Sequence, residues 1–144
     1  MVRPHFFRAP TDNDKGFGNW IAKDWKNNRL DSLSTTITKP LEAVRNADGT
    51  VTVSVSTTNK YINGSIRADY TYKMDAEGSV DFHATYTPEG TLPPLPCMGN
   101  TFVLPKEMTQ LSWYGMGLQD TYPDRLEAAS IGRWNSTVAE QYVH

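Results

Sequence analysis

Ile66-Arg-Ala-Asp-Tyr-Thr-Tyr-Lys-Met74 is the stretch of sequence that decides the fold. Its even-numbered positions hold Ile, Ala, Tyr, Tyr and Met, while Arg, Asp, Thr and Lys hold the odd ones. Successive side chains of a β-strand point to opposite faces of a sheet, so this alternation gives one apolar and one polar face. The stretch therefore predicts a strand of an antiparallel sheet with one solvated face.

The residues before this stretch repeat its alternation. Asn46-Ala-Asp-Gly49 has the composition of a hairpin turn, and the strand predicted after it covers Thr50 to Thr58, where valines alternate with Thr and Ser. Before the turn, Ser34 to Arg45 predicts a strand that is broken or bulged at Pro40, because proline cannot donate a ladder hydrogen bond. Asn59 to Gly64 is rich in turn residues and is expected to form the next connection.

The residues after the stretch also indicate short strands. Asp75-Ala-Glu-Gly78 is expected to reverse the chain, and Val80 to Tyr86 alternates again. Thr91-Leu-Pro-Pro-Leu-Pro96 suits neither a helix nor a central strand, so it predicts a stiff connection. Two further strands are expected at Met98 to Leu104 and at Met108 to Tyr114.

The first 27 residues of the chain lack the alternation that predicts strands. Residues 1 to 18 contain two prolines and a cluster of Asp, Asn and Gly, which predicts an ordered loop. Asn19 is then expected to cap a short helix, Trp20 to Asn27, whose Ile21 and two tryptophans fall on one face. We expect this helix to lie against a sheet.

The fold class follows from these segments. The chain of 144 residues has the length of one domain, and we treat residues 1–144 as a single domain. About seven strands, mostly antiparallel, and one short helix near Trp20–Asn27 predict a mainly β protein. An antiparallel β-sandwich, or part of one, is the natural way to close such strands.

Composition narrows the classes of partner. A formal net charge of -2 gives no electrostatic footprint for nucleic acid or for an anionic membrane. No apolar run approaches the roughly 18 residues that span a bilayer, and no targeting signal is evident, so we expect a soluble chain and infer no compartment. Cys97 is the only cysteine, which excludes an internal disulfide.

Motifs for metal binding and covalent catalysis are missing from the sequence. Asp12-Asn-Asp-Lys-Gly16 is reminiscent of a calcium loop, but the glycine falls at the fifth position and Lys23 at the twelfth, where an acidic residue is required. Asp12 and Asp14 are better interpreted as caps of backbone amides in a turn. No Gly-x-Ser-x-Gly, P-loop or dinucleotide-binding pattern occurs.

One segment is unsuited to a core strand: Trp113-Tyr-Gly-Met-Gly-Leu-Gln-Asp-Thr-Tyr-Pro-Asp-Arg125. Its aromatics offer flat faces with polar tips, and its carboxylates and arginine can bind hydroxyl groups or each other. An ion pair between Asp124 and Arg125 that braces the loop is favoured over direct ligand contact on chemistry alone. A short helical turn is expected around Asp124 to Ala129.

Two long motifs carry a resemblance to a known family. Phe6-Phe-Arg-Ala-Pro-Thr-Asp-Asn-Asp-Lys-Gly16 resembles the Phe-Trp-Arg-Ala-Pro-Thr-Asp-Asn-Asp-x-Gly segment of the multidomain β-galactosidases of glycosidase family two. Trp113 to Arg125 is similar to that family's Trp-x-Gly-x-Gly-Pro-x-Glu-x-Tyr-x-Asp-Arg. Leu92-Pro-Pro-Leu-Pro96 and Phe102-Val-Leu-Pro105 fall between them in the family's order.

The resemblance implies a piece of the C-terminal β-supersandwich, a galactose-mutarotase-like domain beside a catalytic (β/α)8 barrel. The catalytic glutamates of that family, and its magnesium and sodium sites, belong to the barrel. We therefore expect this chain to be an excised segment with no cofactor and no catalytic residue of its own. Its parent is expected to hydrolyse terminal β-galactosides, and the chain alone is expected to be inactive.

The resemblance also suggests what the chain contacts. The expected partners are other domains of the parent enzyme, galactosides, and further copies of the chain through exposed strand edges. An alternative is a noncatalytic carbohydrate-binding module built on the aromatic segment. The candidate residues for sugar or interdomain contact are Arg8, Asp12, Asn13, Asp14, Trp113, Tyr114, Tyr122, Asp124 and Arg125.

Overall fold

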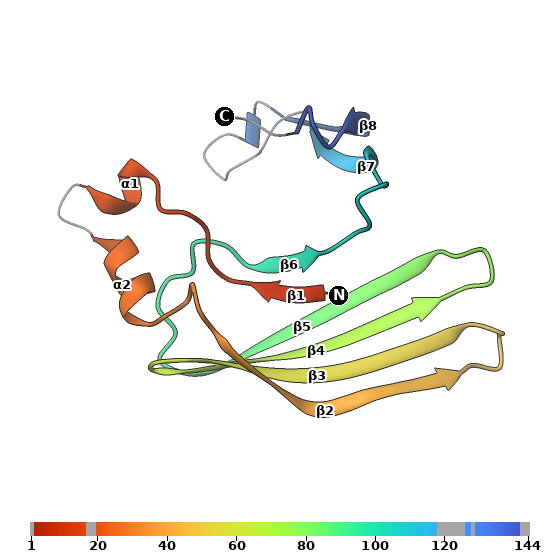
Figure 1. The fold of residues 1–144 in the computed structure, drawn as a ribbon, viewed down its shortest axis with the longest axis horizontal. Helices are drawn as coiled ribbons and strands as arrows, with labels where there is room; N and C mark the ends of the chain where they lie inside the picture. The colour runs from red at the N-terminus through yellow and green to blue at the C-terminus, as the bar shows by residue number, and fades with distance from the viewer. Residues whose placement is uncertain (1, 17–19, 118–125, 128, 142–144) are drawn as a thin grey trace. The chain divides into compact units, whose positions relative to one another are not determined.

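Two compact units make up the chain, one covering Val2–Thr101 and the other including Phe102–His144. The computed structural model describes residues 2–16, 20–117, 126, 127 and 129–141 (Figure 1). Each unit has its own sheet structure. The treatment of residues 1–144 as a single domain stays a prediction.

The first unit is built on a four-stranded antiparallel sheet. Its strands follow the order β2 (Ser34–Arg45), β3 (Val51–Tyr61), β4 (Gly64–Met74) and β5 (Val80–Gly90), so each strand pairs with its neighbours in sequence (Figure 1). The predicted mainly β, antiparallel fold is confirmed.

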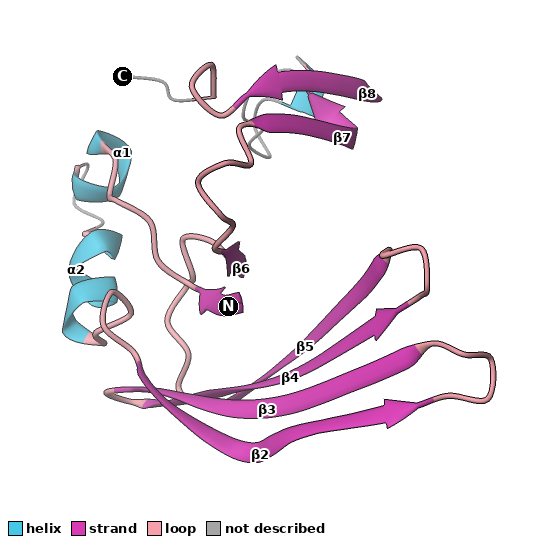
Figure 2. Ribbon diagram, turned by 45° about the vertical axis from the view of Figure 1, so that its right-hand side comes forward, coloured by secondary structure: helices cyan, strands magenta, loops and turns pink. Residues whose placement is uncertain are grey.

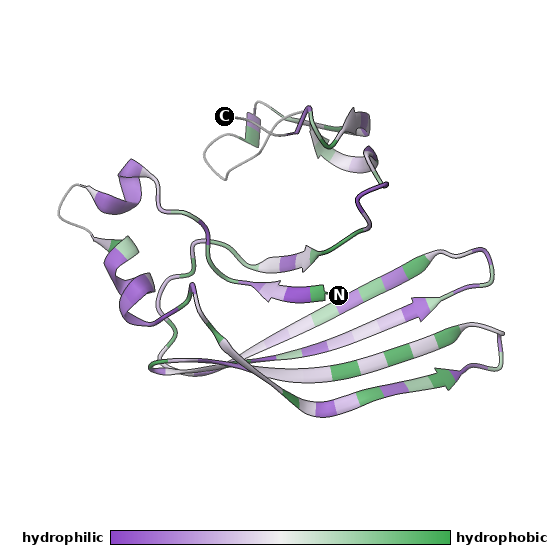
Figure 3. Cartoon of the chain, viewed as in Figure 1, coloured by the Kyte–Doolittle hydropathy of each residue, from purple (hydrophilic) through white to green (hydrophobic). Residues whose placement is uncertain are grey.

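The alternation of apolar and polar residues in Ile66–Met74 is found in β4 of the structure. Ile66, Ala68 and Tyr70 are buried, whereas Arg67 between them is exposed. Figure 3 shows this alternation as bands of hydropathy along the strands of the sheet. Antiparallel register sets Tyr70 opposite Val55 of β3 and Ala84 of β5, so the apolar side chains of three strands share one face.

The predicted turns at Asn46–Gly49 and Asp75–Gly78 are confirmed, with Gly49 and Gly78 at φ +85° and +89°. The predicted turn across Asn59 to Gly64 is too long, because β3 continues to Tyr61. Asn59 is fully buried within the strand, where its side-chain amide donates to the Ile66 carbonyl at 3.1 Å and accepts from the Thr35 hydroxyl at 2.8 Å. These bonds satisfy a polar side chain that sequence reasoning assigned to a turn.

The edge strand β2 is irregular where the sequence predicted it to be. Its register against β3 shifts between Ile37 and Lys39 and again between Lys39 and Glu42, and the second interval contains Pro40. Proline and bulges at a sheet edge remove hydrogen-bonding groups that a second chain could pair with.

The predicted loop at residues 1 to 18 is wrong in part. It contains β1 (Val2–His5), which pairs with β6 (Gly99–Phe102), and a one-turn helix α1 (Asp12–Lys15). The Asp14 carboxylate accepts from the Thr11 amide at 2.7 Å, and this bond stabilises the first turn of α1, which begins after both prolines.

The second helix, α2 (Ile21–Asn27), begins one residue later than predicted, with Trp20 at its N-cap position. The predicted cap Asn19 lies outside the described residues. Trp25 is 2% exposed and packs in the core as expected, but Trp20 is 62% exposed. The described part of the chain therefore has two short helices, where the sequence predicted one.

The core of the first unit lies where the β1–β6 pair and α2 cover one end of the sheet (Figure 2). The Phe6 ring meets the Tyr86 ring of β5 edge-on at 5.1 Å, and the Tyr86 hydroxyl donates to the Gly99 carbonyl at 3.1 Å. These contacts join two β layers, as in a sandwich. The buried cluster consists of Phe6, Ala22, Trp25, Leu30, Tyr61 and Ile66.

The second unit holds a hairpin of β7 (Gln110–Gly117) and β8 (Ser130–Thr137). The strand predicted at Met108 to Tyr114 thus begins and ends later, and β8 was missed. Leu126 and Glu127 form a short 3₁₀ turn within the region where a helical turn was expected.

Candidate functional site

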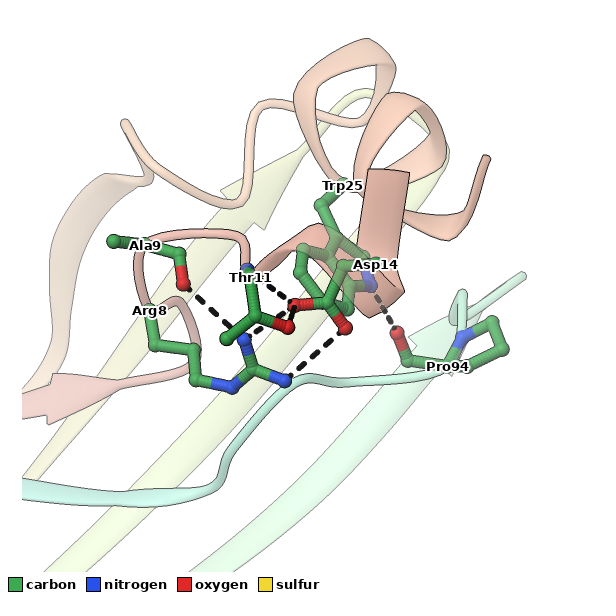
Figure 4. A network of polar contacts seen from close by, with 6 residues as sticks. All are labelled: Arg8, Ala9, Thr11, Asp14, Trp25 and Pro94. Carbon is green, nitrogen blue, oxygen red and sulfur yellow. Dashed lines mark hydrogen bonds and ion pairs between the residues drawn. The ribbon is translucent and has the colours of Figure 1, made fainter. Parts of the chain in front are cut away.

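The first candidate site is a network around Asp14 (Figure 4). The Arg8 guanidinium donates from Nη1 to Asp14 Oδ2 at 2.6 Å and from Nη2 to Oδ1 at 3.2 Å, which is a two-pronged ion pair. The Thr11 amide and hydroxyl donate to the same Oδ2 at 2.7 and 2.8 Å. One carboxylate therefore closes the segment from Arg8 to Asp14 into a ring.

The hydrogen bonds and the ion pair of this network determine the ionisation state of the Asp14 carboxylate. Hydrogen bonds from Arg8, and then from Thr11, lower the pKa of Asp14 from 3.8 to about 2, against an opposing effect of burial. Asp14 is thus ionised at neutral pH with both oxygens occupied. A general acid needs a pKa near the working pH, so this carboxylate is suited to bracing and unsuited to proton transfer.

Trp25 extends the network to two other segments. Its ring centroid lies 5.4 Å from the Arg8 guanidinium carbon, a cation–π contact, and its indole nitrogen donates to the Pro94 carbonyl at 2.7 Å (Figure 4). The motif loop, α2 and the proline-rich connection are therefore held at one point. Sequence reasoning placed Trp25 on the buried face of a helix but missed this role.

The other two candidates in the motif are separate from this network. Asp12 and Asn13 are exposed, and within the described residues their side chains make no hydrogen bond. The structure therefore brings Arg8 and Asp14 together and leaves their two neighbours facing solvent.

The second candidate site lies on the β7–β8 hairpin. Trp113 and Tyr114 point to opposite faces of β7, and Tyr114 is 75% exposed. Trp113 lies directly opposite Trp134 of β8, and the Trp134 indole nitrogen donates to the Gly115 carbonyl at 3.0 Å.

Trp134 also explains a glycine of the motif. A Cβ atom at Gly117 would lie 2.5 Å from the Trp134 indole nitrogen, whereas a Cβ at Gly115 would meet nothing closer than 3.9 Å. Only glycine therefore lets the indole lie across the end of β7. Trp134 was missed as a partner of the aromatic segment, because nothing in the sequence pairs residues 113 and 134 before the hairpin register is known.

Tyr122, Asp124 and Arg125 lie outside the described residues. Their assignment as contact residues, and the ion pair between Asp124 and Arg125, stay predictions. Both alternatives for this loop, an ion pair that braces it and direct contact with a ligand, therefore stay predictions.

The described residues contain neither a cluster of metal ligands nor a membrane-spanning helix. No three His, Cys, Asp or Glu side chains among residues 2–16, 20–117, 126, 127 and 129–141 cluster in a way that could hold a metal ion. Neither described helix has the length and apolar character needed to cross a membrane.

Comparison with known proteins gives consistent results over the whole chain. Residues 1–144 match the family model described as the β-galactosidase small chain. Proteins named β-galactosidase are similar in sequence, with 31% identity in Vibrio cholerae over 96% of this chain and 30% in Lactobacillus delbrueckii subsp. bulgaricus over 95%. The chain spans only 14% and 13% of the length of these two relatives.

Substitution of Asp14 by Asn is expected to lower the free energy of unfolding by about 1–2 kcal/mol, because a charge-assisted pair becomes a neutral contact. Asp12→Asn makes the same chemical change two residues away on an exposed side chain. Chemical denaturation at neutral pH should show a loss for Asp14→Asn alone. Equal stabilities of the two variants would contradict the bracing role.

The same pair predicts a pH dependence. Since the pKa of Asp14 in the folded chain is about 2, below the ordinary 3.8, its stabilisation is complete above pH 3.8 and is lost as the pH falls toward 2. The difference in unfolding free energy between wild type and Asp14→Asn should therefore shrink over this range. A difference that stays constant from neutral pH down to about pH 2 would be inconsistent with the ion pair.

Gly117→Ala is expected to destabilise the β7–β8 hairpin by about 1–3 kcal/mol, because the new methyl group displaces the Trp134 indole. Gly115→Ala is the matched control, since its methyl group has room. Hydrogen exchange of the hairpin amides should rise in Gly117→Ala and stay near the wild-type rate in Gly115→Ala. Similar exchange in both variants would refute the contact.

Proposed function

Because this chain belongs to the β-galactosidase small-chain family, we propose that it is a noncatalytic part of an enzyme that hydrolyses terminal β-galactosides. Its role is to supply a folded scaffold and contacts to the rest of that enzyme. The chain spans 13–14% of its relatives' length, so most of such an enzyme lies outside the sequence described.

The observation that carries this proposal is the apolar face of the four-stranded sheet, which continues beyond the part that the core covers. Ile66 and Tyr70 lie under the core, and Tyr72 and Met74 follow them on the same face. Val53 lies opposite Tyr72 and Val80 opposite Met74, so the apolar surface continues across three strands. We call this continuation, made of Val51, Val53, Tyr72, Met74 and Val80, the open face.

The open face is only partly shielded. Val80 is 52% exposed, and Val51, Val53, Tyr72 and Met74 are intermediate in burial. Burial of apolar area stabilises by about 25 cal/mol per Å², so a contiguous face of this kind is expected to be covered by a partner. A second part of the same enzyme is the occupant that we favour, given how much longer the relatives are.

The chemistry of the described carboxylates supports a noncatalytic role. Retaining glycosidases use two carboxyl groups about 5–5.5 Å apart, one of them with a raised pKa. The Asp14 carboxylate of the first motif has a lowered pKa and four hydrogen bonds to its oxygens. It is therefore a structural group.

A carbohydrate-binding module is the second candidate function, with galactosides as its ligands. The observation that favours it is Tyr114, which is 75% exposed on the hairpin beside Trp113. Exposed aromatic faces suit the apolar faces of sugar rings. In this alternative Tyr122, Asp124 and Arg125 complete the contact surface.

Catalysis is tested directly with the purified chain and a chromogenic β-galactoside. We expect no turnover above the uncatalysed rate, because the resemblance places the catalytic glutamates of the family in the barrel domain and outside this segment. Measurable hydrolysis that follows the protein through purification would refute the noncatalytic role.

Self-association is a further part of the proposal. Strand edges and the open face are surfaces through which copies of the isolated chain can pair. Val53→Lys puts a charge on the open face, and Ser54→Lys puts the same charge on the opposite face of β3.

Light scattering should show association of the wild-type chain, with a dissociation constant raised at least about tenfold in Val53→Lys, equivalent to ~1.4 kcal/mol. Ser54→Lys should associate as the wild type does. A wild-type chain that stays monomeric over a wide concentration range would contradict self-association.

A further inference from the structure

A hollow beside the two helices borders the core at Ala22 and lies apart from the open face. It has a volume of about 1020 Å³ and is bounded by residues of α1, α2 and the proline-rich connection. Sites for small molecules typically have volumes of about 300–1,000 Å³, so this hollow has room for a ligand of one or two rings. Its apolar lining residues include Pro10, Ile21 and Pro94. We call it the helix groove.

Trp20 is the largest side chain that lines the helix groove. It is 62% exposed, whereas Trp25 on the same helix is 2% exposed. Within the described residues the Trp20 indole makes no hydrogen bond or ring contact. Among the described residues, packing thus accounts for Trp25, and the Trp20 ring and its N–H donor have no partner.

Hydrogen-bonding groups surround this aromatic face. Asp24 follows Trp20 by four residues, and Asn27 follows Asp24 by three. These spacings set the three side chains along one side of α2. Asn13 of α1 also lines the helix groove. In the part of the chain that the structure describes, the side chains of Asn13, Asp24 and Asn27 have no hydrogen-bond partner.

The combination is suited to a sugar ring. The C–H face of a pyranose stacks on an indole, and its hydroxyl groups both donate to carboxylates and exchange hydrogen bonds with amides. A purely apolar ligand would leave these amides and the carboxylate unpaired, at a cost of about 1–3 kcal/mol for each group that becomes buried.

Charge narrows the class of sugar. Lys15, Lys23 and Lys26 line the helix groove with a single carboxylate, Asp24, although the whole chain has a net charge of -2. None of these lysines takes part in an ion pair within the described residues. The local excess of positive charge favours a ligand that carries a negative group.

We propose that the helix groove binds an anionic hexose, with the ring on Trp20 and its acidic group toward the lysines. Asn13, Asp24 and Asn27 bind the ring hydroxyls. This site is independent of the open face and of the hairpin aromatics, so its presence does not depend on the proposed scaffold role.

The test is an NMR titration of the 144-residue chain with four probes: galactose 6-phosphate, glucose 6-phosphate, galactose and inorganic phosphate. Saturable shifts of the Trp20 indole N–H signal are expected with the hexose phosphates, at a dissociation constant of about 1 mM. Galactose should bind at least several-fold more weakly, and inorganic phosphate should leave the Trp20 signal unmoved.

Two variants make the result specific. Trp20→Ala should raise the dissociation constant for hexose phosphates at least tenfold, as judged from the side-chain amide signals of Asn13 and Asn27. Leu41→Ala removes an apolar side chain of similar exposure, 68%, from β2 and should leave the affinity unchanged. Replacement of Lys23 and Lys26 together by Gln should lower the affinity for hexose phosphates to that for galactose.

Three results would overturn the proposal. The first is the absence of saturable shifts with any hexose phosphate, and the second is equal shifts with inorganic phosphate alone. The third is an affinity for hexose phosphates that Trp20→Ala leaves intact. A Trp20→Ala chain whose spectrum retains the wild-type dispersion excludes misfolding as the cause of lost binding.

Discussion

Burial of one face of β4 is the constraint on which the first unit depends. Ile66, Ala68 and Tyr70 can be removed from water together only if β3 and β5 pair in a single register, because a slip by one residue would move every side chain to the other face. Phe6 and Trp25 then complete the core from outside the sheet. β1 and α2 thus contribute to the same core that the apolar face of β4 begins.

The Arg8–Asp14 ion pair adds a polar constraint to this packing, because it closes the segment from Arg8 to Asp14. The charged residues of this motif resemble those of a functional site, but they interact with other residues of the same unit. Thr11 donates hydrogen bonds to Asp14, and the Arg8 guanidinium lies over the Trp25 ring. A polar motif can thus be specific because it fixes a loop against a core. The Trp134 indole over Gly117 gives the aromatic motif of the second unit a similar structural basis.

Sequence reasoning succeeded where periodicity carried the signal. The hairpins around β4 and the bulge at Pro40 were predicted because alternation and turn composition are local properties. It failed at Asn59, where a turn-forming residue is buried by bonds to Thr35 and Ile66, and at β1, whose partner β6 lies about 95 residues away. The exposed Trp20 was also missed, because helical periodicity does not reveal which of two tryptophans the core has room for.

The proposed scaffold role requires that the open face form an interface with the rest of a β-galactosidase. Hydrogen exchange of β3 and β4, measured in the isolated chain below its association range and within the complete enzyme, tests it most directly. We expect stronger protection at Val51, Val53, Tyr72 and Met74 in the complete enzyme, with little change at Ile66, which the core already buries. Equal protection of the open face in both forms would contradict it.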